Sequence, residues 1–188
     1  MRPFLLAPML LGALLLATGA SLAQNPIANN SVPLCTAIQP NPNTSCIDES
    51  TQVERMHACP THFALTGASN SNNRFLCTWV GDIDKMYVAN ASSPENQVSM
   101  GGYASLACKA GFVTLGINIE ENRMYCGAVV GATIEGESSF RQVRTQSSIV
   151  ACPATVDTKS LSVMKGWNQS YSTMICQNIR LAPAPSKR

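Results

Sequence analysis

The sequence predicts a mostly β, compact, disulfide-stapled domain built from three similar β-hairpin units, two of them close and one divergent, with few short helices. Three observations lead to this class. All eight cysteines lie beyond an apolar N-terminal segment. A segment with two cysteines 18 positions apart occurs twice, within residues 57–77 and 106–126. Apolar residues alternate along both copies, which is the signature of half-buried strands.

The first 23 residues have the layout of a secretory signal peptide. Arg2 supplies a basic start, residues 4–16 form an apolar run, and small residues lead to Ala23. This three-part layout predicts cleavage after Ala23. The apolar run is shorter than the roughly 20 residues that a membrane-spanning helix needs. We therefore expect a secreted protein, extracellular or at the periplasm or cell surface, without a membrane span.

The rest of the chain divides by composition. Residues 24–46 are rich in Pro and Asn, which predicts an irregular segment with a small disulfide loop. Residues 47–181 are expected to form one β-rich domain, and residues 182–188 a disordered tail. The three units are expected at about residues 56–100, 101–145 and 146–181. The segments between them lack the composition of flexible linkers, which favours one compact domain over three loosely strung modules.

The cysteines are interpreted as a disulfide framework, because an even number in an exported chain is typical of one. Equal separations within the repeated segments favour pairing of neighbours along the chain, and each of the two 17-residue loops closed in this way would stabilise the fold by roughly 3 kcal/mol. The expected pairs are Cys35 with Cys46, Cys59 with Cys77, Cys108 with Cys126, and Cys152 with Cys176. A zinc site is disfavoured, since no two cysteines are spaced as structural zinc ligands usually are.

The first two units share further residues in register. These are Phe63 and Phe112, Gly67 and Gly116, Asn73 and Asn122, and Arg74 and Arg123. An Ala precedes the first cysteine of all three units, whereas Ser160 stands where the other units have Gly. In the first unit we expect strands at 59–66 and 72–80 with a turn at Gly67, so that the cysteines share the buried face with the aromatic residues.

Further elements are expected between the hairpins. Strand candidates lie at residues 84–89, 127–134 and 139–145. Residues 48–58 and 93–100 each follow a possible N-cap, which predicts short helices there.

The composition of the chain argues against nucleic-acid binding. Without Arg2, 12 basic residues stand against 11 acidic ones, so the mature chain has a net charge of about +1. A nucleic-acid-binding protein normally concentrates basic charge on one face, so no nucleic-acid partner is expected. Only 13% of the residues are charged. Such a surface forms hydrogen bonds more than ion pairs.

No catalytic, metal or cofactor motif is recognised. The only two histidines, His57 and His62, flank a cysteine that is expected to be bridged, and we interpret them as surface or loop residues. Asp82 and Asp84 could approach a calcium ion, but the remaining ligands of a calcium loop are missing. A glycosidase uses two carboxylates that need only meet in space, so no sequence motif would reveal this chemistry. We expect no enzyme, no cofactor and no metal.

Four residues are the candidates for a binding surface. Arg74 and Arg123 occupy equivalent positions on the face opposite the cysteines, where they could contact a carboxylate or sulfate. Trp167 and Tyr171 lie in what the spacing suggests is a longer loop of the third unit, with the composition of binding loops.

The function expected from these features is that of a secreted, non-catalytic binding or adhesion-type module that recognises an extracellular glycan or protein. One alternative is a structural or assembly component of the cell envelope or of an extracellular appendage, for which self-association would be the sign. Another is a secreted enzyme inhibitor or a small hydrolase. A cleft joining His57 or His62 to a carboxylate would favour the hydrolase, and a rigid exposed loop would favour the inhibitor.

Overall fold

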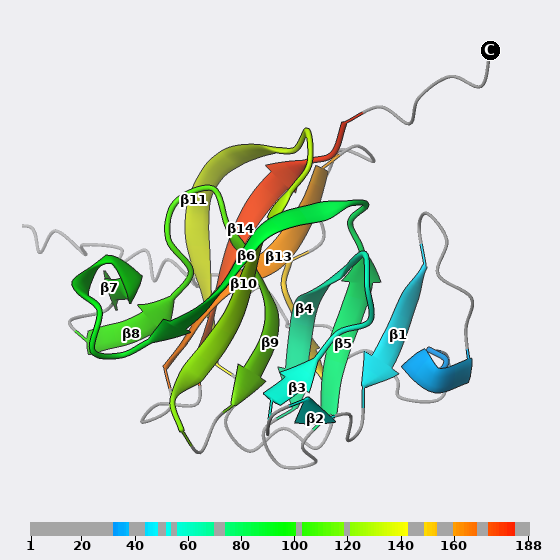
Figure 1. Ribbon diagram of the computed structural model, residues 1–188, viewed down its shortest axis with the longest axis horizontal. Helices are drawn as coiled ribbons and strands as arrows, with labels where there is room; N and C mark the ends of the chain where they lie inside the picture. Colours follow the sequence, from blue (N-terminus) through cyan, green and yellow to red (C-terminus); the bar gives the residue numbers. More distant parts are fainter. Residues whose placement is uncertain are drawn as a thin grey trace, which may run out of the picture.

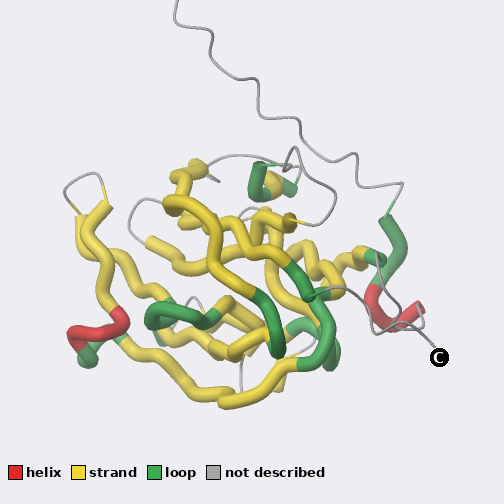
Figure 2. The backbone as a smooth tube through the Cα atoms, turned by 90° about the horizontal axis from the view of Figure 1, so that it is seen from above, coloured by secondary structure: helices red, strands yellow, loops and turns green. Residues whose placement is uncertain are grey.

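The structure is a computed structural model in which most of the described residues are in strands (Figure 1). The residues that it describes are 32–37, 44–48, 52–53, 56–69, 74–100, 103–118, 121–142, 149–153, 160–168 and 173–182. They contain two single-turn 3-10 helices, η1 (Cys35–Ala37) and η2 (Pro94–Asn96). Figure 2 shows these turns at opposite sides of the molecule. None of the described helices is long and apolar enough to span a membrane.

Three antiparallel hairpins form the centre of the fold. They are β4–β5 (Phe63–Ser69 and Arg74–Trp79), β9–β10 (Val113–Asn118 and Arg123–Val129) and β13–β14 (Ser160–Asn168 and Thr173–Arg180). Their first strands pack against one another. The predicted fold class is therefore confirmed: the described chain is mostly β and has three hairpin units.

Each hairpin belongs to a separate sheet in which other parts of the chain supply the flanking strands. On the outer side lie β1 (Ser45–Asp48), β6 (Ile83–Asn90) and β11 (Thr133–Gln142), in the sheets of the first, second and third hairpin. On the other side lie β12 (Val150–Ala151), β3 (Met56–Ala58) and β8 (Tyr103–Ala107), in the same order. The short strands β2 (Gln52–Val53) and β7 (Gln97–Met100) extend the second and third sheets beyond β3 and β8.

The strand before the first cysteine of each unit pairs with the hairpin of a different unit. Its Ala lies opposite a Gly inside the neighbouring strand, and the three pairs are Ala58 with Gly116, Ala107 with Gly166, and Ala151 with Gly67. A Cβ on Gly116 would lie 2.7 Å from the carbonyl oxygen of His57, closer than side chains tolerate. The shared Ala and Gly residues therefore allow the backbones of neighbouring units to approach closely.

A β-bulge accompanies each of these contacts. The register shifts immediately before the Gly in all three hairpins. The carbonyl of the bulged residue accepts a hydrogen bond from the backbone N–H of the first cysteine of another unit. These bonds are Cys59 to Leu115, Cys108 to Lys165, and Cys152 to Thr66, at 2.8, 2.8 and 2.7 Å. The bulge thus locks each cysteine to the neighbouring hairpin.

The four disulfides join the cysteine pairs that the spacing predicts: Cys35–Cys46, Cys59–Cys77, Cys108–Cys126 and Cys152–Cys176. Their sulfur atoms lie in or against one apolar core shared by the three sheets, together with Phe63, Met124, Met164 and Trp167. Four disulfides in one small domain are typical of an oxidising compartment.

Several expected element boundaries are wrong. The first hairpin strand begins at Phe63, after a turn, so Cys59 and Thr61 do not belong to it. Gly67 lies inside β4 and forms no turn, because its missing side chain is needed for contact with Val150 and Ala151. The equivalent Gly of the third unit is Gly166, since the extra residues of that unit precede its first strand.

The helix expected at residues 48–58 is also wrong. Its described part contains the strands β2 and β3, because pairing with β9 overrides the local helix signals. Residues 93–100 form the single turn η2 followed by the strand β7. The expected signal peptide and the tail from residue 183 onward lie outside the described residues.

Candidate functional site

Two equivalent turns follow the first cysteines of the first two units, and we name them the first corner (residues 59–63) and the second corner (residues 108–112). In both, the Phe that opens the hairpin donates its backbone N–H to the carbonyl three residues earlier: Phe63 to Pro60 at 3.0 Å and Phe112 to Lys109 at 3.1 Å. In both, the residue before this Phe is left-handed, with φ 73° at His62 and φ 84° at Gly111.

A pocket of about 420 Å³ opens beside the first corner. The corner supplies one side, and β6, β9, β10 and the turn before β6 supply the other. The lining residues are Cys59, Pro60, Thr61, His62, Phe63, Asp82, Ile83, Met86, Leu115 and Tyr125. Its size lies within the range of small-molecule sites, and its lining combines an apolar wall with a few polar side chains, as such sites do.

His62 and Asp82 form a pair at the rim of this pocket. His62 Nδ1 lies 3.1 Å from Asp82 Oδ1, and the side chains are 41% and 81% exposed. The backbone carbonyl of His62 accepts a hydrogen bond from the N–H of Val80 at 2.8 Å, which fixes the left-handed residue against the end of β5. A carboxylate at Nδ1 favours the proton on that nitrogen, so that Nε2 of the neutral ring remains an acceptor.

A bulge in β6 shapes the opposite wall. The pairing of β6 with β10 shifts between Cys126 and Ala128, and Lys85, one of the two bulged residues of β6, has φ 49°. The next residue, Met86, is 55% exposed, and its Sδ accepts a hydrogen bond from the Tyr125 hydroxyl at 3.2 Å. Bulges next to binding sites commonly redirect a side chain in this way.

The left-handed residues provide a second reason to single out this pocket. Among the described residues other than Gly, only His62, Lys85 and Asn122 have positive φ. Asn122 lies in a hairpin turn, where Asn adopts this conformation readily. The other two border the pocket, one by lining it and one by preceding Met86. Backbone strain of this kind gathers at functional sites.

The second corner is closed by its own side chains. The Lys109 ammonium lies 4.7 Å from the centre of the Tyr87 ring and 4.6 Å from that of Phe112, and the two rings meet edge to face at 5.1 Å. The Tyr87 hydroxyl accepts the backbone N–H of Lys109 at 2.7 Å and donates to Asn96 Oδ1 at 3.2 Å. Burial raises the pKa of Tyr87 above its ordinary value, the N–H of Lys109 opposes this, and Glu95 adds to the rise.

The structure separates the residues that the sequence suggested for binding. Arg74 and Arg123 begin β5 and β10 at equivalent positions, both half-buried, and Arg123 Nε lies 3.1 Å from Glu121 Oε2. The expectation that Trp167 lies in an exposed loop is wrong: it is part of β13 and 2% exposed. Tyr171 lies outside the described residues. These candidates therefore do not form one described surface.

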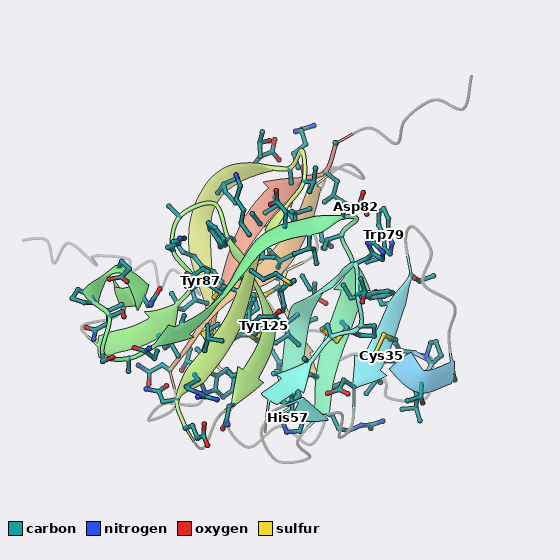
Figure 3. The ribbon with its side chains drawn as sticks, viewed as in Figure 1. Cys35, His57, Trp79, Asp82, Tyr87 and Tyr125 are labelled. Atoms are coloured by element: carbon teal, nitrogen blue, oxygen red, sulfur yellow. A yellow bond between two sulfur atoms is a disulfide. The ribbon has the colours of Figure 1, made fainter. Side chains whose placement is uncertain are left out.

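The interpretation of His57 as a surface or loop residue is also wrong. It lies in β3, buried, with Nδ1 3.5 Å from Asp48 Oδ2 and its ring 4.9 Å from that of Phe75. In Figure 3 it lies at the lower end of the molecule, whereas Asp82, the partner of His62, lies at the upper end. The two histidines thus belong to different places, and His57 helps to hold β1 against the first hairpin.

The sequence indicates Asp82 only as a possible calcium ligand, and it gives no signal for Met86 or Tyr125. Within the described residues, no group of three or more His, Cys, Asp and Glu is arranged to hold a metal ion. A signal for His62 was available in the sequence, because aligning the two copies places it opposite Gly111. A position that favours Gly in one copy and carries an ionisable side chain in the other is a candidate for function.

Comparison of the chain with models of protein families, with curated proteins and with solved structures finds no match.

Proposed function

We propose that this protein is a secreted, non-catalytic binding module that recognises an extracellular glycan or protein through the pocket beside the first corner. The observation that carries the proposal is the pairing of this pocket with a left-handed His62, at a position where the second corner has Gly. Gly would fit this backbone at least as well, so the His is best understood through what its side chain does in the pocket.

Secretion is part of the proposal and has two supports. The first is the signal-peptide layout of residues 1–23. The second is the set of four disulfides, which persist in the extracellular space or the periplasm and are rare in a reducing cytosol.

The experiment compares two aspartates two residues apart. Asp82 lines the pocket, whereas Asp84, also exposed, does not. The oxidised mature protein, residues 24–188, is labelled and applied to a broad glycan array and to a panel of extracellular proteins. Asp82→Asn should weaken binding to whichever ligand is found, and Asp84→Asn should leave it unchanged. A ligand that both variants bind as the wild type does would place recognition elsewhere and contradict the proposal.

A small hydrolase is a second candidate, favoured by the contact between His62 and Asp82. A carboxylate that orients an imidazole prepares its other nitrogen to act as a general base towards a water molecule or a hydroxyl group. Hydrolysis of a chromogenic ester, phosphodiester or glycoside that is lost in both His62→Ala and Asp82→Asn would favour this candidate over binding alone.

A further inference from the structure

The walls of the pocket beside the first corner differ in chemistry. Pro60, Ile83 and Leu115 are apolar, and Met86, from the bulge of β6, adds a fourth apolar side chain. Thr61, His62, Asp82 and Tyr125 bring polar atoms to the same space. A ligand that fills the pocket must therefore be apolar on one face and able to form several hydrogen bonds at its edge.

The polar groups are mostly acceptors. Asp82 uses one carboxylate oxygen on His62, and the side chain is 81% exposed, so its other oxygen faces solvent. Nε2 of the neutral His62 ring is a second acceptor. Thr61 contributes a hydroxyl that can donate or accept. An apolar peptide side chain would desolvate these acceptors without satisfying them, which is unfavourable.

Tyr125 supplies a donor that a ligand can take over. Its exposed hydroxyl donates a hydrogen bond to the thioether sulfur of Met86 at 3.2 Å. A thioether is a weak acceptor, so exchange for a ligand oxygen strengthens the bond. The pocket therefore combines two acceptors at its rim with one donor on the opposite wall.

Charge narrows the ligand further. Asp82 and Asp84 are exposed and outnumber the one neighbouring cation, Lys85, so the charge beside the pocket disfavours a ligand carrying carboxylate or sulfate groups. A neutral, polyhydroxylated ring meets all of these conditions. Its hydroxyl groups can donate to Asp82 and His62, a ring oxygen can accept from Tyr125, and its C–H face can pack on the apolar wall at Ile83 and Leu115.

We propose that the pocket beside the first corner binds one neutral pyranose unit of a glycan, with Asp82 accepting hydrogen bonds from its hydroxyl groups and Tyr125 donating one to it. This inference rests on the proposed function and specifies its ligand class.

The test is a titration of the ¹⁵N-labelled, oxidised mature protein with neutral methyl pyranosides, followed by amide chemical shifts. The pyranosides differ in the orientation of single hydroxyl groups, and a glucuronide and a set of short apolar peptides are titrated alongside. We expect at least one neutral pyranoside to shift the amides of Thr61, His62, Asp82 and Ile83, and the glucuronide to bind more weakly.

Three variants assign the contacts. Asp82→Asn should weaken binding of the pyranoside by about tenfold or more, and Tyr125→Phe by about two- to tenfold, in line with charged and neutral hydrogen bonds. Asp84→Asn, the matched control, should stay within about twofold of the wild type. Amide spectra of the free variants establish that each is folded.

The outcomes separate this inference from the proposed function. If only peptides shift the pocket amides and Asp82→Asn weakens their binding, the sugar is wrong and the binding pocket stands. If pyranosides shift amides elsewhere, or bind equally to Asp82→Asn and the wild type, the inference is overturned. If neither titrated ligands nor the glycan and protein panels bind in a manner that depends on Asp82, both proposals fail.

Discussion

The first and second corners have the same backbone turn but use it differently. In the second corner Gly111 takes the left-handed conformation, and Lys109 lies over the contacting rings of Tyr87 and Phe112. In the first corner the left-handed residue is His62, and the space beside it is a pocket. The comparison teaches that the turn itself requires only a left-handed residue, so that the side chains around it are free to close one corner and to open the other.

The largest expected effect comes from breaking the frame that holds both corners. Gly116→Ala and Gly166→Ala would each place a Cβ within 2.7 Å of a backbone carbonyl, that of His57 beside the first corner or that of Leu106 beside the second. Backbone atoms cannot rotate away, so each variant should lose about 2 kcal/mol of unfolding free energy. Urea unfolding of the oxidised protein measures this. Ala110→Ser, an exposed change in the second corner, is the control, and equal stability of control and variants would contradict the close approach.

The next effect tests how the second corner is closed. Lys109→Ala removes a cation that lies near two aromatic rings, and should lower the unfolding free energy by about 1 kcal/mol at this exposed site. Lys109→Arg keeps the charge and should retain most of the stability, whereas Lys109→Met keeps only the packing. If Lys109→Arg and Lys109→Met lose the same stability, the positive charge is not what stabilises this corner, and the fit of the Lys109 side chain is.

Exchanging the left-handed residues gives a smaller effect, with opposite signs at the two corners. Gly111→Ala should destabilise by about 1 kcal/mol, and since a Cβ there meets nothing within 4 Å, the loss would come from its φ alone. His62→Gly relieves the same strain and loses only an exposed contact with Asp82, so a gain of about 0.5 kcal/mol is expected. The same variant should lose ligand binding. Thermal unfolding measures the stability of the two variants, and the glycan titration measures binding by His62→Gly. Destabilisation by His62→Gly as well as by Gly111→Ala would contradict the claim that His62 is strained.

The smallest effect is a pH dependence of the second corner. Burial and Glu95 hold the pKa of Tyr87 above its ordinary value. The folded state therefore keeps the proton after the unfolded chain has lost it, and stability contributed by Tyr87 falls as the pH rises through and above 10. Absorbance titration at 295 nm should show this tyrosine ionising late, and the late step should vanish in Tyr87→Phe. A late step that persists in this variant would assign it to another tyrosine.

Much of the fold could be predicted because it rests on local spacing. Cysteine pairs at short, equal separations and alternating apolar residues identify the disulfides and the hairpins. The pairing of Ala58 with Gly116 could not be predicted, because it joins different units and no local pattern specifies it. The local pattern therefore predicts a turn at Gly67, where the structure has a strand. It also predicts a longer loop around Trp167, whereas the additional residues of the third unit all precede Gly166.

The candidate site was harder to predict for a related reason. His62 and Asp82 meet across a whole hairpin, and Tyr125 arrives from another unit. This convergence depends on how strands of different sheets pack together, which no local sequence pattern specifies. Only the alignment of His62 with Gly111 carried local information, and it indicated a special residue without indicating its partners.

Because the units exchange flanking strands, the three sheets can be completed only in a certain order while the chain is made from its N-terminus onward. The second sheet has all its strands once residue 129 is available. The first sheet, although its hairpin is made earliest, must wait for Val150 and Ala151. Both cysteines of its own bridge, Cys59 and Cys77, are available long before then. A crosslink formed at that stage would hold the incomplete first sheet together until the last unit is made.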